Sequence, residues 1–237
     1  MAAYTTRKTV FGVKAESTSG TPVDLASGSD IIGIQDGFEL NPSFETIDNN
    51  ELSPNVAAKA PIIGTEKPTS SISHYIRHSG VEATEPNYGP LLKAALGDSV
   101  AAFSEKLTTS GSTAGTSAAR AIVKLASGGS SFERGHCVLI KDGSNGYSLR
   151  NVLSIATNDL TLLFNLTAAP ASGIGTGRPI LYKPADAPAA LSLWCFRANG
   201  AAKEVISGAL VSEMTIDGTA GQPLNGSFTL DGVGYYF

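Results

Sequence analysis

The sequence predicts a mainly β protein with one helix and a separate small β module. Long segments near both ends alternate apolar and polar residues with a period of two, which is typical of strands with one buried and one wet face. The segment Pro86–Gly97 has helical spacing instead. Gly- and Ser-rich loops divide the middle of the chain into short strands, which favours a small β-barrel or sandwich there.

The first long strand is expected over about 31–46. Its even positions are apolar (Ile32, Ile34, Phe38, Leu40, Phe44), and its odd positions are polar (Gln35, Glu39, Asn41, Ser43, Glu45). The segment Asp30–Glu51 holds six acids and no Lys or Arg. A strand with so many carboxylates on its solvent-exposed face predicts a surface that repels anions rather than a catalytic pocket.

A long loop is expected over 47–66, and loops of this length inside a compact domain are uncommon. It carries four apolar residues that a purely solvated loop would not need: Leu52, Val56, Ile62 and Ile63. Either the loop packs on another subunit or it folds back on its own domain. We expect the first of these.

The second strand, 67–79, places Ile72, His74 and Ile76 on one face. A histidine among apolar residues is predicted to be structural rather than a ligand. In the helix at Pro86–Gly97, Pro90 suits the first turn and Gly97 the C-terminal cap. Its apolar residues form a stripe that should lie against the sheet: Tyr88, Leu91, Leu92, Ala95 and Leu96.

Residues 100–185 differ from the rest of the chain in the length of their predicted strands and in charge. They hold eight Lys or Arg and four acids, whereas the remainder holds nine and seventeen. The sequence therefore predicts a discontinuous domain, 1–99 with 186–237, and an inserted domain, 100–185. Short strands are expected in the insert (119–125, 136–141, 147–156, 160–164, 178–182) and long ones after it (191–198, 204–217, 224–231).

Several function classes lack support in the sequence. Charged residues make up 16% of the chain, and no Lys/Arg stripe predicts a nucleic-acid binder. No apolar run approaches the ~18 residues of a membrane helix. Cys137 and Cys195 lie far apart and predict neither a disulfide framework nor a metal cluster. The N-terminus has no hydrophobic signal core, which predicts a protein made in a reducing cytosol.

The search for catalytic groups is also negative, so we expect neither an enzyme nor a cofactor. The glycines of 173–177 are interpreted as a turn because no helix or Lys-Ser/Thr pair follows them. Glu39 and Glu45, six positions apart on one strand, would lie roughly 20 Å apart, which is too far for a two-carboxylate glycosidase site.

A resemblance to a known family rests on three stretches. They are Arg77-His78-Ser79-Gly80, Tyr88-Gly89-Pro90-Leu91-Leu92-Lys93-Ala94-Ala95-Leu96-Gly97, and Ser207-Gly208-Ala209-Leu210-Val211 followed by Gly226-Ser227-Phe228-Thr229-Leu230. With the acidic strand and the long loop, they resemble the tail tube (major tail) proteins of long-tailed bacteriophages. The resemblance covers about 1–99 and 186–237.

The resemblance implies a β-sandwich of two packed sheets with one flanking helix. It also implies hexameric rings that stack into a tube, in the virion tail, through which DNA reaches the host. Assembly would take place in the host cytoplasm, without a membrane, beside tape measure, tail terminator and distal tail proteins. Candidate lumen acids are Glu39, Glu45, Glu213 and Asp217, which could equally belong to an ordinary solvated face. The candidate ring-to-ring loop contains Leu52, Val56, Ile62 and Ile63, and the insert should lie on the tube exterior.

Two other functions compete with this one. The first is a capsid decoration or adhesion protein whose insert binds carbohydrate. The second is an enzyme such as a polysaccharide hydrolase. The missing pair of close acids and the single Trp argue against the second, because a sugar site normally exposes several aromatic residues.

Overall fold

The computed structural model describes residues 9–26, 28–51, 59–81, 84–100, 103–141, 146–186, 188–197, 200 and 202–237. The protein is mainly β, and α1 (Gly89–Leu96) is the α-helix of the described residues, beside the short 3-10 turns η2 (Gly28–Asp30) and η3 (Gly129–Ser131). The predicted fold class is confirmed. The chain divides into two compact units: unit 1 (Met1–Gly80, Glu85–Asp98 and Tyr182–Phe237) and unit 2 (Val81–Thr84 and Ser99–Leu181).

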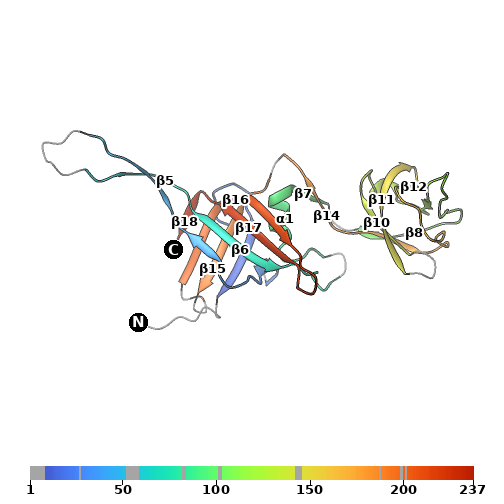
Figure 1. Cartoon of the computed structure of the whole chain (residues 1–237), viewed down its shortest axis with the longest axis horizontal. Coiled ribbons are helices and arrows are strands. Elements are labelled where there is room, and N and C mark those ends of the chain that lie inside the picture. The colour runs from blue at the N-terminus through green and yellow to red at the C-terminus, as the bar shows by residue number, and fades with distance from the viewer. Residues whose placement is uncertain are drawn as a thin grey trace. The chain divides into compact units, whose positions relative to one another are not determined.

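Unit 1 is built on one antiparallel sheet (Figure 1). Its strands are β1 (Val10–Ala15), β2 (Ile31–Ile32), β3 (Glu39–Asn41), β6 (Thr69–Tyr75), β15 (Leu191–Arg197), β16 (Ala202–Asp217), β17 (Asn225–Asp231) and β18 (Gly234–Tyr236). They follow the order β2-β1-β15-β16-β17-β6-β3, with β18 also paired to β16. The long strands predicted after the insert are thus confirmed within a few residues at each end.

β16 divides the sheet into two layers. Its first half, to Ala209, pairs with β15, and its second half, from Leu210, pairs with β17. We call β2, β1, β15, β18 and the first half of β16 layer A, and the second half of β16 with β17, β6 and β3 layer B. Between the halves, Gly208 has φ +63, and its N–H donates to Glu16 Oε1 at 2.9 Å. A side chain at Gly208 would be strained and would crowd Val233.

The core of unit 1 contains fully buried side chains from both layers, such as Phe11 and Leu193 of layer A with Phe228 and Leu230 of layer B. Cys195 is buried in this core, and burial raises the pKa of its thiol to about 11. A thiol in this state is inert at neutral pH.

Helix α1 begins and ends as the sequence predicts. Pro90 lies in the first turn, and Gly97 has φ +106 with its N–H donating to Lys93 O. A Cβ on Gly97 would lie 2.3 Å from Ala185 O, so only glycine fits. Leu91 and Ala94 are buried in the core, and the helix contacts β16, β1 and β15.

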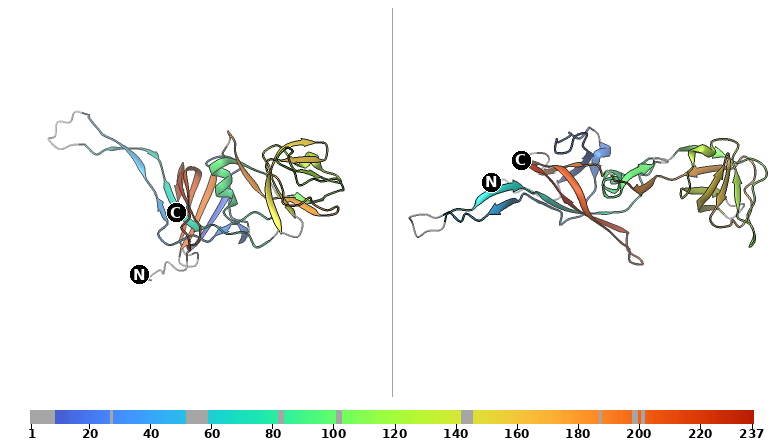
Figure 2. Two further views of the ribbon diagram at one scale, coloured as in Figure 1. Left: turned by 45° about the vertical axis from the view of Figure 1, so that its right-hand side comes forward. Right: turned by 90° about the horizontal axis from the view of Figure 1, so that it is seen from above.

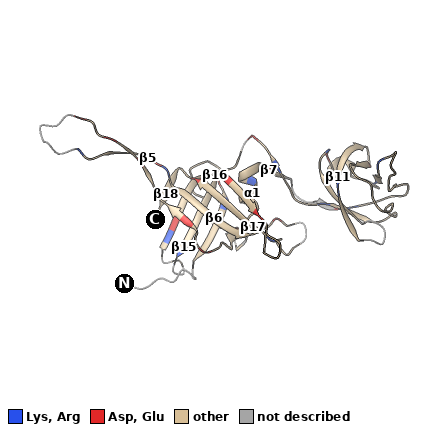
Figure 3. Cartoon of the chain, viewed as in Figure 1, with Lys and Arg blue, Asp and Glu red and all other residues tan. Residues whose placement is uncertain are grey.

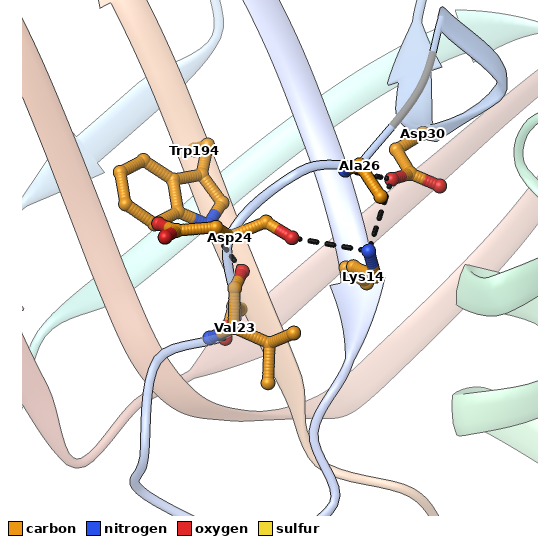
Figure 4. Close-up of polar contacts among 7 residues, drawn as sticks. Lys14, Val23, Asp24, Ala26, Asp30 and Trp194 are labelled. Carbon is orange, nitrogen blue, oxygen red and sulfur yellow. Dashed lines mark hydrogen bonds and ion pairs between the residues drawn. The ribbon is translucent and has the colours of Figure 1, made fainter.

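The segment after β1 is tied to layer A by side-chain hydrogen bonds (Figure 4). The Trp194 indole N–H donates to Val23 O at 2.9 Å, and Lys14 Nζ donates to Asp24 O at 3.0 Å. Lys14 also lies 3.3 Å from Asp30. These contacts hold 23–30 along β1 and β15.

The expectation of one strand over 31–46 is wrong. The chain forms β2, turns at Asp36-Gly37, forms β3, and continues as β4 (Phe44–Ile47). Gly37 has φ +90, which interrupts an extended strand. The alternation holds where the chain follows the sheet, since Ile32 and Leu40 are buried, but Phe44 is 55% exposed.

β4 leaves the sheet and pairs with β5 (Ile62–Glu66) to form a two-stranded hairpin, which we call the arm (Figure 2). The expectation of an irregular loop over 47–66 is therefore wrong at 62–66. Paired β-branched and aromatic residues explain the strand, because they favour extended backbone. Leu52 and Val56 lie outside the described residues.

Unit 2 contains β8 (Phe103–Leu107), β9 (Ile122–Lys124), β10 (Cys137–Lys141), β11 (Tyr147–Ala156), β12 (Asp159–Leu162) and β13 (Gly175–Arg178), in the order β8-β13-β10-β11-β12-β9. The Ala126 N–H donates to Leu107 O, and the Thr109 N–H donates to Lys124 O. These bonds join the first strand to the last and close a small barrel around Val138, Ile140, Leu160 and Leu162. β7 (Gly97–Val100) and β14 (Leu181–Pro184) pair where the chain passes between the units.

The strands predicted over 119–125, 136–141 and 160–164 are found with shifted ends, and β11 matches its predicted bounds. The strand predicted over 178–182 is wrong, because it spans the break between β13 and β14, and β8 is missed. A tight turn joins β11 to β12, with Thr157 at φ 56. The interpretation of 173–177 as a turn holds at Gly173, which has φ +78, and is wrong at 175–177, because Gly175 and Gly177 lie in β13. Gly175 has a packing role there, since the Glu105 side chain occupies the space that a Cβ would take.

Candidate functional site

One side of layer B carries carboxylates and hydroxyls, and we call it the acidic face. Cross-strand register defines its members, because directly opposed residues of antiparallel strands share a face. Glu39, Ser71, Thr229 and Glu213 form one row across the four strands. Tyr75, Asn225 and Asp217 form a second row. The other members of the face are Asn41, Thr69, Ser73, Thr215, Ser227, Asp231 and, directly opposite Asp231, the exposed Leu210.

The acidic face is solvated and has no cation. Glu39, Glu213, Asp217 and Asp231 are all exposed, and none of the face residues is Lys or Arg (Figure 3). The hydroxyls of Ser73 and Ser227 lie 3.1 Å apart, within hydrogen-bond distance. Apart from Leu210, the face therefore presents negative charge and neutral polar groups, and it offers a polyanion no site for ion pairing.

The reverse side of layer B packs into the core. His74 is buried between Tyr88, whose ring centroid lies 4.5 Å away, and Phe228, at 5.5 Å. Its Nδ1 lies 3.2 Å from Tyr75 O. Burial lowers the His74 pKa, with a smaller contribution from the charge of Arg77, so the ring stays neutral. His74 is thus the structural residue that the sequence predicted.

The structure separates Glu45 from the other three predicted acids. Glu45 lies on the arm, where it accepts a hydrogen bond from Thr65 Oγ1 at 2.9 Å and lies 3.3 Å from Lys67 Nζ. The bonds to Thr65 and Lys67 lower the pKa of this exposed carboxyl. Asp231 takes its place on the acidic face. Asp231 lies on β17, directly opposite Thr69 of β6. Only the strand register, which the sequence alone does not give, shows that Asp231 belongs to this face.

The arm has apolar side chains on both of its faces. Ile47 opposes Ile62, and Ile63 opposes Thr46 on the other side. The exposed fractions are 52% for Ile47, 49% for Ile62 and 71% for Ile63. Exposed apolar groups on two sides of a projecting hairpin indicate a segment that another surface covers.

Layer B ends in two unpaired edges. Among the described residues, no strand pairs with the outer edge of β3, nor with the edge of β16 residues 210–217 that faces away from β17. Unpaired edges of this length are ready to pair with another chain. The described residues include no cluster of three or more His, Cys, Asp or Glu that could hold a metal ion.

The chain matches the family described as phage tail tube protein over residues 6–236. It belongs to that family. A search of curated proteins found no match. Phage tail tube proteins are structural components of the virion tail, and this chain is therefore a structural bacteriophage protein with a β-sandwich fold. Within the described residues, no helix is both long and apolar enough to span a membrane.

Proposed function

We propose that this chain forms hexameric rings that stack into the phage tail tube, and that DNA passes through the tube into the host. Strand direction in layer B supports ring closure. β16, β17, β6 and β3 are joined by three antiparallel pairings, so β16 and β3 run in opposite directions. A copy rotated about the ring axis can therefore place its β16 antiparallel to β3. A rotation that repeats this contact closes a ring and leaves no free edge.

The acidic face is proposed to line the channel. Glu39, Glu213 and Asp217, joined by Asp231, would surround DNA with like charge. A surface without Lys or Arg releases no counterions from DNA, so DNA would not adhere to it. Serine and threonine hydroxyls on the same face keep the channel hydrated. This function needs neither catalysis nor a cofactor, and DNA passes without specific binding.

The arm is proposed to make the ring-to-ring contact. Ile62 and Ile63 would be covered by the next ring, and Leu52 and Val56, which precede β5 in the sequence, are proposed to join them. Burying an exposed isoleucine side chain contributes about 1.5–3 kcal/mol. Repeated around a ring, such contacts would hold the stack together.

The proposed tube also suggests roles for the two domains, a place of assembly and a set of partners. The proposed domains are 1–99 with 186–237, which builds the tube, and 100–185, which lies on its exterior. The tube would assemble in the host cytoplasm and end in the tail of the virion. Its proposed partners are other copies of the chain and the tape measure, tail terminator and distal tail proteins.

Negative-stain electron microscopy of the purified protein tests this proposal. We expect six-fold rings or tubes with a central channel. Strictly monomeric particles at high protein concentration would contradict it.

A further inference from the structure

A pocket of about 290 Å³ opens in unit 1 where β6 ends. It is lined by residues of three segments, among them Gly33, His74, Tyr75, Arg77 and His78. The lining contains a guanidinium and two imidazoles, but no carboxylate. The pocket lies beside the segment that leads into β3, which is one of the two open edges of layer B.

The cation at the rim of this pocket lacks an acid. The Arg77 guanidinium is exposed and lies over Gly33, with one nitrogen 2.9 Å from the position that a Cβ would take. Within the described part of the chain, Arg77 has no carboxylate partner. His78 Nδ1 accepts a hydrogen bond from the Gly80 N–H at 3.0 Å, which leaves its Nε2–H to donate. The rim thus offers donors suited to a carboxylate.

A complementary acid lies at the opposite edge of layer B. Asp217 is the last residue of β16 and is exposed. It shares a cross-strand row with Asn225 and Tyr75, and Tyr75 lines the pocket. Asp217 and the pocket therefore lie at the same level along the strands, on opposite edges of the layer. The Asp217 carboxylate on one edge and the Arg77 guanidinium on the other, which has no acidic partner among the described residues, are complementary between successive copies.

We propose that a second copy of this chain completes the pocket, with Asp217 of the neighbouring copy bound by Arg77 and His78. This inference rests on the proposed ring, in which β16 of one copy lies beside β3 of the next. An Arg–carboxylate pair has directional, bidentate geometry and so fixes register as well as contributing attraction. The pair would set the alignment of adjacent subunits. Asp217 would then lie at the subunit boundary with its charge neutralised, and Glu39, Glu213 and Asp231 would carry the unpaired negative charge of the channel surface.

Charge reversal followed by mixing tests this pairing. Arg77→Glu and Asp217→Arg should each raise the protein concentration needed for assembly by at least about tenfold, because each places like charges together. An equimolar mixture of the two variants should assemble at close to the wild-type concentration, because alternating subunits restore an opposite-charge pair at every interface. Assembly is measured by light scattering and electron microscopy, with circular dichroism to check folding.

Glu213→Arg is the matched control, since Glu213 is an exposed acid on the same face of the same strand. Glu213→Arg keeps both members of the pair, so it should assemble alone at close to the wild-type concentration. In an equimolar mixture with Arg77→Glu, it should not draw the Arg77→Glu protein into the assemblies. The pairing is overturned if either single variant assembles like wild type, if the mixture stays unassembled, or if Glu213→Arg rescues equally well. Each of these outcomes would reject the pairing of Asp217 with Arg77 without rejecting the proposed ring. A wild-type protein that never assembles would instead contradict the proposed function.

Discussion

The acidic face and the arm are both exposed surfaces of unit 1, but they expose different kinds of side chain. The acidic face presents Glu39, Glu213 and Asp231 with no cation, so water solvates it fully. The arm presents isoleucines on both sides, and one of its carboxylates, Glu45, lies 3.3 Å from Lys67 Nζ. The first surface is suited to remain in contact with water. The second is suited to be covered by another protein surface.

The largest expected effect is a loss of stability when a core residue on the reverse side of the acidic face is truncated. Phe228 is fully buried, and its neighbour Thr229 lies on the acidic face of the same strand. Phe228→Ala should lower the free energy of unfolding by about 3–5 kcal/mol, because it leaves a cavity between the layers. Thr229→Ala should change it by less than about 0.5 kcal/mol. Urea denaturation measures both, and equal losses would show that the two faces of β17 are not distinct.

The arm should control assembly without controlling folding. Ile63→Glu places a charge where we propose an apolar contact, and it should raise the protein concentration needed for tube formation by about tenfold or more. The melting temperature should stay within about 2 °C, because Ile63 is exposed in the monomer.

Leu149→Glu is the control for the arm. Leu149 is also apolar and is 53% exposed, but it lies on β11 of unit 2. Tube formation should be unchanged in this variant if the insert lies outside the tube contacts. Sedimentation and electron microscopy distinguish the two variants. An Ile63→Glu protein that forms tubes like wild type would remove the arm from the ring-to-ring contact.

Reversing charge on the acidic face should create DNA binding without blocking assembly. We expect tubes of Glu39→Lys/Glu213→Lys protein to retain double-stranded DNA at about 50 mM salt and to release it at higher salt. Glu45→Lys, on the arm, should not retain DNA. Co-sedimentation of DNA with tubes measures this. Retention by the Glu45 variant alone would mean that the arm, rather than the acidic face, lines the channel.

A pH effect is expected from His74. Because burial lowers its pKa in the folded state, the unfolded chain binds the proton more readily. Its contribution to stability is therefore complete above about pH 6.5 and is lost as the pH falls below that value. Thermal unfolding between pH 7.5 and 5 should show a steeper loss for wild type than for His74→Gln. The exposed His78→Gln variant should behave like wild type.

The smallest effect belongs to the exposed Glu45–Lys67 pair. Glu45→Gln should leave the unfolding free energy nearly unchanged, as exposed ion pairs contribute little. The same substitution should leave the acidic face unaffected. A large loss of stability would mean that the pair anchors the arm to the sheet.

The sequence predicts this fold well where one face of an element is buried, and less well elsewhere. Alternation identifies β6, β16 and β17, and Pro90 with Gly97 identifies α1. The predicted strand over 31–46 fails because periodicity does not show that the chain turns at Gly37 or that β4 leaves the sheet. β5 is missed because its isoleucines face outward on a two-stranded arm. Three of the four predicted acids share one face, and Glu45 does not, because membership depends on strand register across β3, β6, β17 and β16.

The central claim is that the acidic face looks into a closed channel, and a cryo-electron microscopy map of the assembled tube tests it most directly. We predict six subunits per ring, β16 of each subunit antiparallel to β3 of the next, and Glu39 and Glu213 facing the axis. A tube in which these carboxylates face outward, or in which neighbouring layers do not join edge to edge, would contradict the account.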